Sequence, residues 1–244
     1  MEYEARLTPD RPVVVYVHGN RMPAADLIPR FNAIRKAVRP QLCQKGVDWV
    51  IFSWPSDKAI KGIDDFRLKA SRCDAQGLYL ASLLRRHVDH SVPVTVLGYS
   101  FGARVATGAL HSLGGGSLGG RCLPGASVCN ADIRLALIAP AIDARWLTSR
   151  GYHERASNNI QRMVLLFNHR DIVLKRYWLL AGRRGGQALG VTGLASLSRN
   201  INGASVPFRT RDYSRIIGVR HTELGYYGNG NAAHEVAWLI NDRR

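Results

Sequence analysis

The run "VVVYV" at residues 13–17 constrains the fold more than any other feature of this sequence. Five consecutive apolar residues without polar alternation are typical of a parallel strand that is buried on both faces of a sheet. The run breaks at His18-Gly19-Asn20, and residues 24–39 then have a helical pattern that ends before Pro40. A chain that alternates such strands and helices builds a mostly parallel central sheet with helices on both faces, so an α/β fold is predicted.

The same alternation continues along the chain. Further strands are predicted at residues 47–52, 94–97, 133–138, 163–168 and within 206–214. Further helices are predicted at residues 64–86, 103–113 and 232–242. A length of 244 residues is usual for one α/β domain, so we expect residues 1–244 to form a single domain.

Two glycine-rich segments lack a clear period. Residues 114–130 are predicted to form a surface loop, and residues 172–205 a mobile excursion or cap. Trp178, Leu179, Leu180 and Leu189 in the second segment could line a ligand pocket or belong to the core, and the core is slightly favoured.

The formal net charge of +16 is unusual and comes mostly from arginine. Such a charge suggests an anionic binding partner, which could be nucleic acid, a membrane surface or an acidic substrate. The arginines are scattered, however, and no basic stripe with interleaved aromatic residues follows the chain, which argues against a nucleic-acid site. A solvated basic surface is the favoured interpretation.

Cysteine spacing and the N-terminal residues bear on metals and on the compartment. Cys43, Cys73, Cys122 and Cys129 show neither C-x-x-C nor a His-paired zinc spacing, so no structural metal site is expected. Cys122 and Cys129 flank a short loop and could pair under oxidising conditions or stay free. The N-terminal stretch lacks the apolar core of a secretory signal, and no apolar run is long enough to span a bilayer, which favours the cytoplasm.

The pattern G-x-S-x-G occurs twice, at residues 98–102 and 115–119. At a sharp turn between a strand and a helix this pattern exposes a nucleophilic serine, because the flanking glycines relieve crowding around a strained backbone. Ser100 follows the apolar run "VTVL" and precedes the helix-compatible "ARVATGAL", whereas Ser117 lies between glycines with no strand before it. Ser100 is therefore the candidate nucleophile.

A serine hydroxyl needs a base and an orienting acid, which we expect downstream in the order Ser, Asp, His. Asp171 lies in a loop just past the strand-like "MVLLFN" and is favoured as the acid over Asp143, which follows the preceding strand. His221 lies between the last strand and the closing helix and is the favoured base.

The remaining histidines are less suited to act as the base. His18 belongs to the turn after the first strand, His169 adjoins Asp171, and His234 lies in the closing helix. Four more fall in predicted helices or at their ends and are interpreted as surface residues: His87, His90, His111 and His153.

Acyl transfer also needs two N–H donors for the oxyanion of a tetrahedral intermediate. The amide of Phe101, directly after the candidate nucleophile, is the first. The turn "HGNR" after the first strand supplies the second, from Asn20 or Arg21.

Together, "VVVYVHGNR", "VTVLGYSFGARV", "LLFNHRD" and "GVRHTELGYY" resemble the α/β-hydrolase superfamily of serine hydrolases across nearly the whole chain. The stretch "VIFSWPS" further resembles a poorly characterised bacterial group of α/β hydrolases. The resemblance implies the same nucleophile, acid, base and oxyanion donors. The chain departs from the common pattern at Tyr99, where many members carry His, and in its long glycine-rich segments.

These residues predict a cofactor-free serine hydrolase that cleaves a carboxylic ester or related acyl bond of a small molecule. Two alternatives stay open. The same triad serves acyltransferases and thioesterases, and a hydrolase fold also serves as a catalytically silent binding module whose basic surface docks an anionic partner.

Overall fold

The computed structural model describes residues 4, 7–43, 46–181, 186–228 and 231–241. Six strands form one sheet in the order β2-β1-β3-β6-β7-β8, and all neighbouring strands in it are parallel. The strands are β1 (Val13–Val17), β2 (Asp48–Phe52), β3 (Val94–Tyr99), β6 (Ile133–Ile138), β7 (Ile160–Phe167) and β8 (Phe208–Asp212). The predicted α/β fold with a parallel central sheet is confirmed.

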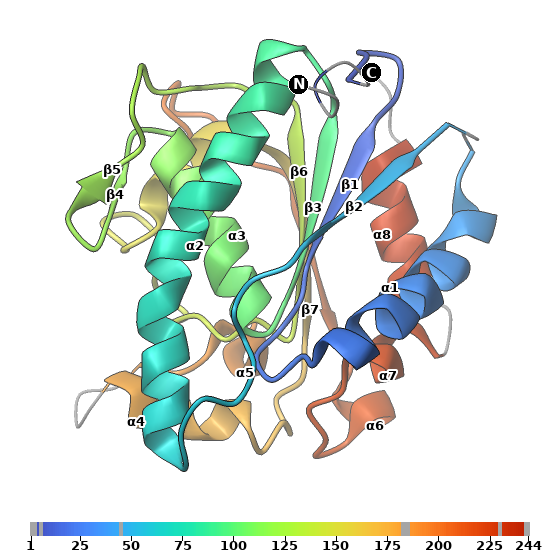
Figure 1. Cartoon of the computed structure of the whole chain (residues 1–244), viewed down its shortest axis with the longest axis vertical. Coiled ribbons are helices and arrows are strands. Elements are labelled where there is room, and N and C mark those ends of the chain that lie inside the picture. Colours follow the sequence, from blue (N-terminus) through green and yellow to red (C-terminus); the bar gives the residue numbers. More distant parts are fainter. Residues whose placement is uncertain (1–3, 5–6, 44–45, 182–185, 229–230, 242–244) are drawn as a thin grey trace.

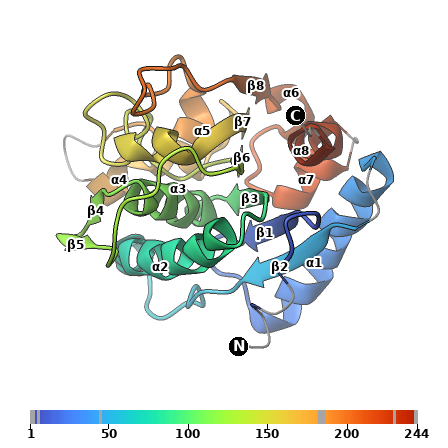
Figure 2. The same cartoon turned by 90° about the horizontal axis from the view of Figure 1, so that it is seen from above.

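Helices cover both faces of this sheet (Figure 1). Helices α2 (Ile63–Asp89) and α3 (Phe101–Leu113) lie on one face, and α1 (Ala24–Val38) and α8 (Asn231–Asn241) on the other, as Figure 2 shows from above. Each of the four agrees with a predicted helix to within three residues at its ends. Residue 242, the predicted end of the last helix, lies outside the described residues.

The central strands are buried along their whole length, as the absence of polar alternation predicts. This holds for β1, β3 and β6, whereas edge strand β2 is half-buried and β8, "FRTRD", exposes its charged residues. Because all six strands are parallel, their carboxyl ends meet at one edge, the lower end of the molecule in Figure 1. Loops at such an edge bring together side chains that lie far apart in the sequence.

The segment 114–130 is largely exposed, in agreement with a surface loop, and it contains a small hairpin that the prediction missed. Its strands β4 (Ser117–Leu118) and β5 (Arg121–Cys122) pair antiparallel. Leu118 is buried, and a Cβ added at Gly77 of α2 would lie 2.9 Å from its side chain. The hairpin is thereby fixed against the helix layer by one apolar side chain.

The segment 172–205 forms short helices: η4 (Leu174–Arg176), α4 (Trp178–Ala181) and α5 (Leu189–Thr192). Leu189 is buried in the core, whereas Trp178 is half exposed. Residues 182–185 lie outside the described residues, and a role of this segment as a cap stays a prediction. The remaining short helices are η2 (Arg39–Gln41), η3 (Glu154–Asn159), α6 (Ser214–Ile217) and α7 (Glu223–Tyr227).

The four cysteines are free thiols, so Cys122 and Cys129 are not paired in this structure. None of the helices within the described ranges is both long enough and apolar enough to cross a bilayer.

Candidate active site

Ser100 occupies the turn between β3 and α3 in a strained backbone conformation. Its φ is +52° and its ψ is −119°, and 7% of its surface is exposed to solvent. Positive φ is uncommon for a residue with a Cβ and clusters at functional sites. The turn is held on both sides, because the Ser100 amide donates to the carbonyl of Ile138 at 3.0 Å and its carbonyl accepts from Ala141 at 3.1 Å. The predicted strand–turn–helix context of Ser100 is present.

The two glycines around Ser100 allow the strand, the turn and the helix to come close together. A Cβ at Gly102 would lie 2.1 Å from the carbonyl oxygen of Val17 at the end of β1. A Cβ at Gly98 would lie 2.7 Å from the Cα of Ala103 in α3. Both neighbours are backbone atoms, which have no alternative rotamer, so any larger residue at either position would push the turn away from the sheet.

His221 and Asp171 meet Ser100 at the carboxyl edge of the sheet. The Nε2 atom of His221 lies 2.9 Å from the Oγ of Ser100, and its Nδ1 lies 2.6 Å from the Oδ2 of Asp171. Asp171 follows β7 and is fully buried, and its Oδ1 accepts the amides of Val173 and Leu174 at 2.9 and 3.0 Å. Three residues separated by up to 121 positions therefore form one hydrogen-bonded chain, and two backbone amides at the start of η4 hold the acid.

The rival acid Asp143 lies elsewhere and has other partners. Its Oδ1 accepts from the backbone amide of Arg145 at 2.8 Å and from the Nε of the same residue at 3.4 Å. The structure thus brings Asp171 to His221 and leaves Asp143 in the turn after β6.

Asn20 and Arg21, the two candidate oxyanion donors after β1, differ in whether their backbone amides already make a hydrogen bond within the described part of the chain. The Arg21 amide donates to the carbonyl of Ser56 at 2.9 Å, so this donor is already engaged and Asn20 stays as the candidate. Phe101 is the first residue of α3, where the N–H groups have no partner within the helix and the helix dipole favours negative charge. Both polar atoms of the Asn20 side chain are buried, and neither bonds to another described residue.

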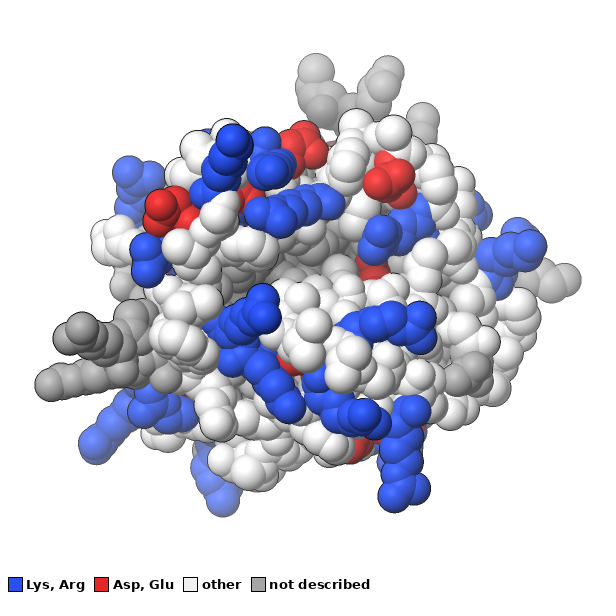
Figure 3. Space-filling view, turned by 90° about the horizontal axis from the view of Figure 1, so that it is seen from below, with Lys and Arg blue, Asp and Glu red and all other residues white. Residues whose placement is uncertain are grey.

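A pocket of about 650 Å³ opens at Ser100 and His221. Figure 3, seen from below, shows the hollowed surface on this side of the molecule. The apolar side chains that line the pocket come mainly from α2 and from the segment after β7. They include Phe66, Val173, Leu179 and Leu180. Leu179 and Leu180, for which a place in the core was slightly favoured, border the pocket, and Leu180 also packs against the core.

Residues 2–189 match the family described as alpha/beta hydrolase of unknown function (DUF900). The chain belongs to this family. Its sequence matches no curated protein. The family covers β1, the Ser100 turn and Asp171, whereas His221 lies beyond the matched residues.

Solved structures similar to this chain include esterases and related enzymes, all at low sequence identity. Acyl-protein thioesterase 2 from Zea mays is 15% identical, with a TM-score of 0.48, over 94% of this chain and 93% of that one. The poly(3-hydroxybutyrate) depolymerase LpqC from Bordetella parapertussis is 15% identical, with a TM-score of 0.48, over 98% and 81%. An acetylxylan esterase is 13% identical, with a TM-score of 0.46, over 93% and 96%.

Three of the four histidines that we expected at the surface of the DUF900 protein are buried, so that prediction is wrong for His87, His111 and His153 and holds for His90. His153 packs between aromatic rings, with the Trp146 ring centroid 4.6 Å away, and burial lowers its pKa well below the usual value. Helix periodicity places a residue on a face of a helix, but the packing of other elements decides whether that face is covered.

Tyr99, where the chain departs from the common hydrolase pattern, contacts the candidate base directly. Its ring stacks on that of His221, with centroids 5.2 Å apart and an interplanar angle of 23°. Tyr99 is buried, and burial raises the pKa of its phenol well above the usual value. The ring therefore stays neutral and forms a flat support for the imidazole.

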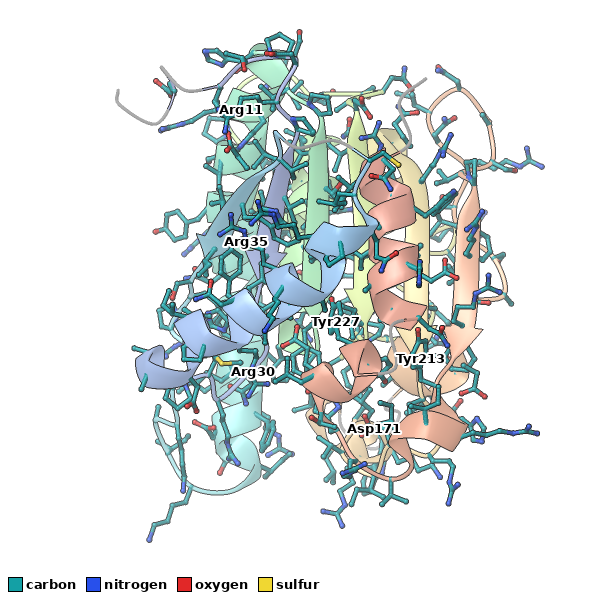
Figure 4. The ribbon with its side chains drawn as sticks, turned by 90° about the vertical axis from the view of Figure 1, so that its right-hand side faces the viewer. Arg11, Arg30, Arg35, Asp171, Tyr213 and Tyr227 are labelled. Atoms are coloured by element: carbon teal, nitrogen blue, oxygen red, sulfur yellow. The ribbon has the colours of Figure 1, made fainter. Side chains whose placement is uncertain are left out.

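The segment that carries His221 is anchored two residues further on, at Glu223, which no sequence pattern singled out. Glu223 in α7 is fully buried, and its Oε2 accepts a hydrogen bond from the Tyr16 hydroxyl of β1 at 2.8 Å. Arg30 of α1 lies 3.9 Å from the same oxygen, and burial raises the pKa of Glu223 to about 7. Figure 4 shows Arg30 of α1, Tyr227 of α7 and Asp171 in the lower half of the view. The only signal in the sequence was an acidic residue in the otherwise uncharged stretch "TELGYY".

Proposed function

We propose that this DUF900 protein is a serine hydrolase that cleaves a carboxylic ester or related acyl bond of a small molecule. The observation that carries the proposal is the hydrogen-bonded chain from Ser100 through His221 to Asp171, with separations of 2.9 and 2.6 Å. A nucleophile, a base and an orienting acid in this order are the requirements for activating a serine hydroxyl.

In the first half of the reaction, the Oγ of Ser100 forms a bond to the acyl carbon while its proton passes to Nε2 of His221. The bond between that carbon and the oxygen of the alcohol half then breaks, and the imidazolium gives the proton to this oxygen, so that the alcohol leaves. Water repeats the sequence on the acyl-enzyme and releases the acid. Asp171 holds the Nδ1–H of the imidazole throughout, and its fully buried position keeps that tautomer fixed.

The negative charge of each tetrahedral intermediate falls on the former carbonyl oxygen. We assign the amides of Phe101 and Asn20 as its donors, because the first belongs to the N-terminus of α3 and the second to the turn beside it. The adjoining pocket of about 650 Å³, with its apolar side chains on α2 and α4, has the size of a small-molecule site.

Covalent labelling tests the proposal. A fluorophosphonate probe reacts with an activated serine, so mass spectrometry of the treated chain should find one adduct, on the peptide that contains Ser100. The S100A variant should remain unlabelled, whereas the S117A variant, which removes the second match to the same pattern, should be labelled like the wild type. An unlabelled wild-type chain would favour the silent binding module instead.

A further inference from the structure

Three arginines line the pocket beside Ser100, and they come from three different parts of the fold. Arg21 follows β1, Arg30 belongs to α1 and Arg176 ends η4. Among the described residues, no aspartate or glutamate lines this pocket. The pocket therefore combines an apolar wall with concentrated positive charge.

The three guanidinium groups differ in how well the protein itself neutralises them. The Nε of Arg21 lies 3.3 Å from Asp65, and its guanidinium stacks over the Phe66 ring at 4.5 Å. Arg176 is exposed and makes no ion pair with another described residue. Arg21 is thus partnered, whereas Arg176 is available at the rim.

Arg30 is the least satisfied of the three relative to its burial. Its side chain is 29% exposed, and its Nε is buried without a hydrogen-bond partner among the described residues. Its nearest carboxylate, Glu223, is 3.9 Å away, which is beyond hydrogen-bond distance. Glu223 already accepts from Tyr16, and burial raises its pKa to about 7, so it is a weak counter-charge near neutral pH.

A guanidinium group that no protein carboxylate holds within hydrogen-bond distance can bind a ligand carboxylate or phosphate through the exposed part of its side chain. The apolar side chains opposite bind a hydrocarbon part of the same ligand. The net charge of +16 and the Lys and Arg side chains around the hollow in Figure 3 raise the local concentration of anions.

We propose that the substrates of this site are esters that carry an anionic group, a carboxylate or a phosphate, which Arg30 binds with Arg176 at the rim. This inference rests on the proposed function and adds the substrate class. The anionic group belongs either to the acyl half or to the alcohol half of the ester, and the experiment separates these two cases.

Two matched pairs of chromogenic esters test the proposal. In the first, the p-nitrophenyl monoester of adipic acid is compared with its methyl-capped neutral analogue, which places the anion in the acyl half. In the second, the butyrate of a carboxylated nitrophenol is compared with the corresponding methyl carboxylate, which places it in the alcohol half. We expect kcat/KM to favour the anionic member of at least one pair by about tenfold in low salt, and the ratio to shrink in 0.5 M NaCl.

Variants locate the preference. R30Q should lower the ratio of anionic to neutral kcat/KM several-fold, and R176Q should lower it to a smaller extent. R35Q is the matched control, because Arg35 is exposed on the same helix away from the pocket and should leave the ratio unchanged (Figure 4). R176Q keeps the test decisive if R30Q fails to fold, since Arg176 is exposed.

The outcomes separate this inference from the proposed function. Hydrolysis of both members of each pair at equal rates, or a loss of the ratio in R35Q as large as in R30Q or R176Q, would overturn the inference and leave the serine hydrolase intact. No hydrolysis of any ester, together with no fluorophosphonate adduct on Ser100, would overturn both.

Discussion

The two G-x-S-x-G segments of this chain are identical as patterns and opposite as structures. Ser100 lies at 7% exposure between a buried strand and a helix, with its Oγ 2.9 Å from His221. Ser117 is exposed in a two-residue strand that pairs with Cys122 in a surface hairpin. The two segments differ in which residue of the pattern has a positive φ.

In the first segment the serine itself has positive φ, at +52°, and the glycines supply close approach between backbones. In the second segment the roles are reversed, because Gly115 and Gly119 have φ values of +84° and +55° and the serine is ordinary strand. The same five-letter pattern therefore forms a strained turn where it joins a sheet strand to a helix, and a surface hairpin with an ordinary serine backbone where it does not.

The largest expected effect separates the two serines by activity. S100A should lower kcat for an activated ester by about 10⁴-fold or more, because the nucleophile is gone, whereas S117A should leave the rate within twofold. Steady-state kinetics on both variants, with circular dichroism to confirm folding, measures this. Equal rates in S100A and the wild type would remove the distinction between the two segments.

The second comparison separates the two aspartates. D171N should lower kcat by about 10⁴-fold, since an amide holds the imidazole in the wrong tautomer. D143N should have a far smaller effect, because Asp143 caps the turn around Arg145 and has no contact with His221. A larger loss in D143N than in D171N would transfer the role of the acid to the loop after β6.

The third comparison concerns the glycines. G102A should destabilise the fold by about 4 kcal/mol or more, because the new methyl group would meet two backbone carbonyls at 2.1 and 2.5 Å. G119A meets only the Asp74 side chain, at 3.6 Å, so its cost of about 1 kcal/mol comes from positive φ alone. Urea denaturation of both variants measures the difference, and similar midpoints would contradict the close approach of β1 to the Ser100 turn.

The smallest expected effect concerns Glu223, which anchors the segment whose His221 contacts Ser100. The pKa of Glu223 is raised from 4.5 to about 7, so the folded chain keeps a proton that the unfolded chain releases between these values. The free energy of unfolding should therefore fall as pH rises through this window, by at most about 3 kcal/mol from this group. E223Q should lose that part of the pH dependence, and denaturation at pH 5 and pH 8 measures it. An unchanged slope in E223Q would show that Glu223 titrates at its ordinary pKa.

Much of the fold was predictable because it depends on local pattern. The strands at 13–17 and 133–138 have the predicted ends, because a continuous apolar run indicates a strand that is buried on both faces. Strand β3 continues two residues past its predicted end, because Gly98 and Tyr99 pair with Leu137 and Ile138 of the neighbouring strand. That pairing involves a distant segment, so no local pattern could show it.

The candidate site was predictable in its order but not in its contacts. Chain order and element ends singled out Ser100, Asp171 and His221, and their catalytic roles stay predictions until the variants are measured. The choice between Asn20 and Arg21 depended on the Ser56 carbonyl, which engages one amide and not the other. The support of His221 by Tyr99 and the anchoring of Glu223 by Tyr16 involve partners up to 207 residues apart, and such contacts leave no local trace.

The sequence by itself determined the alternation of buried strands and helices, and with it the α/β class and the edge at which the functional loops gather. These follow from hydrophobic periodicity, which every segment carries within itself. Only the tertiary structure decided which serine is strained, which aspartate contacts the imidazole, and which described arginines of the pocket have no carboxylate within hydrogen-bond distance. Those properties depend on distances between segments, and sequence separation does not encode distance once the chain has folded back on itself.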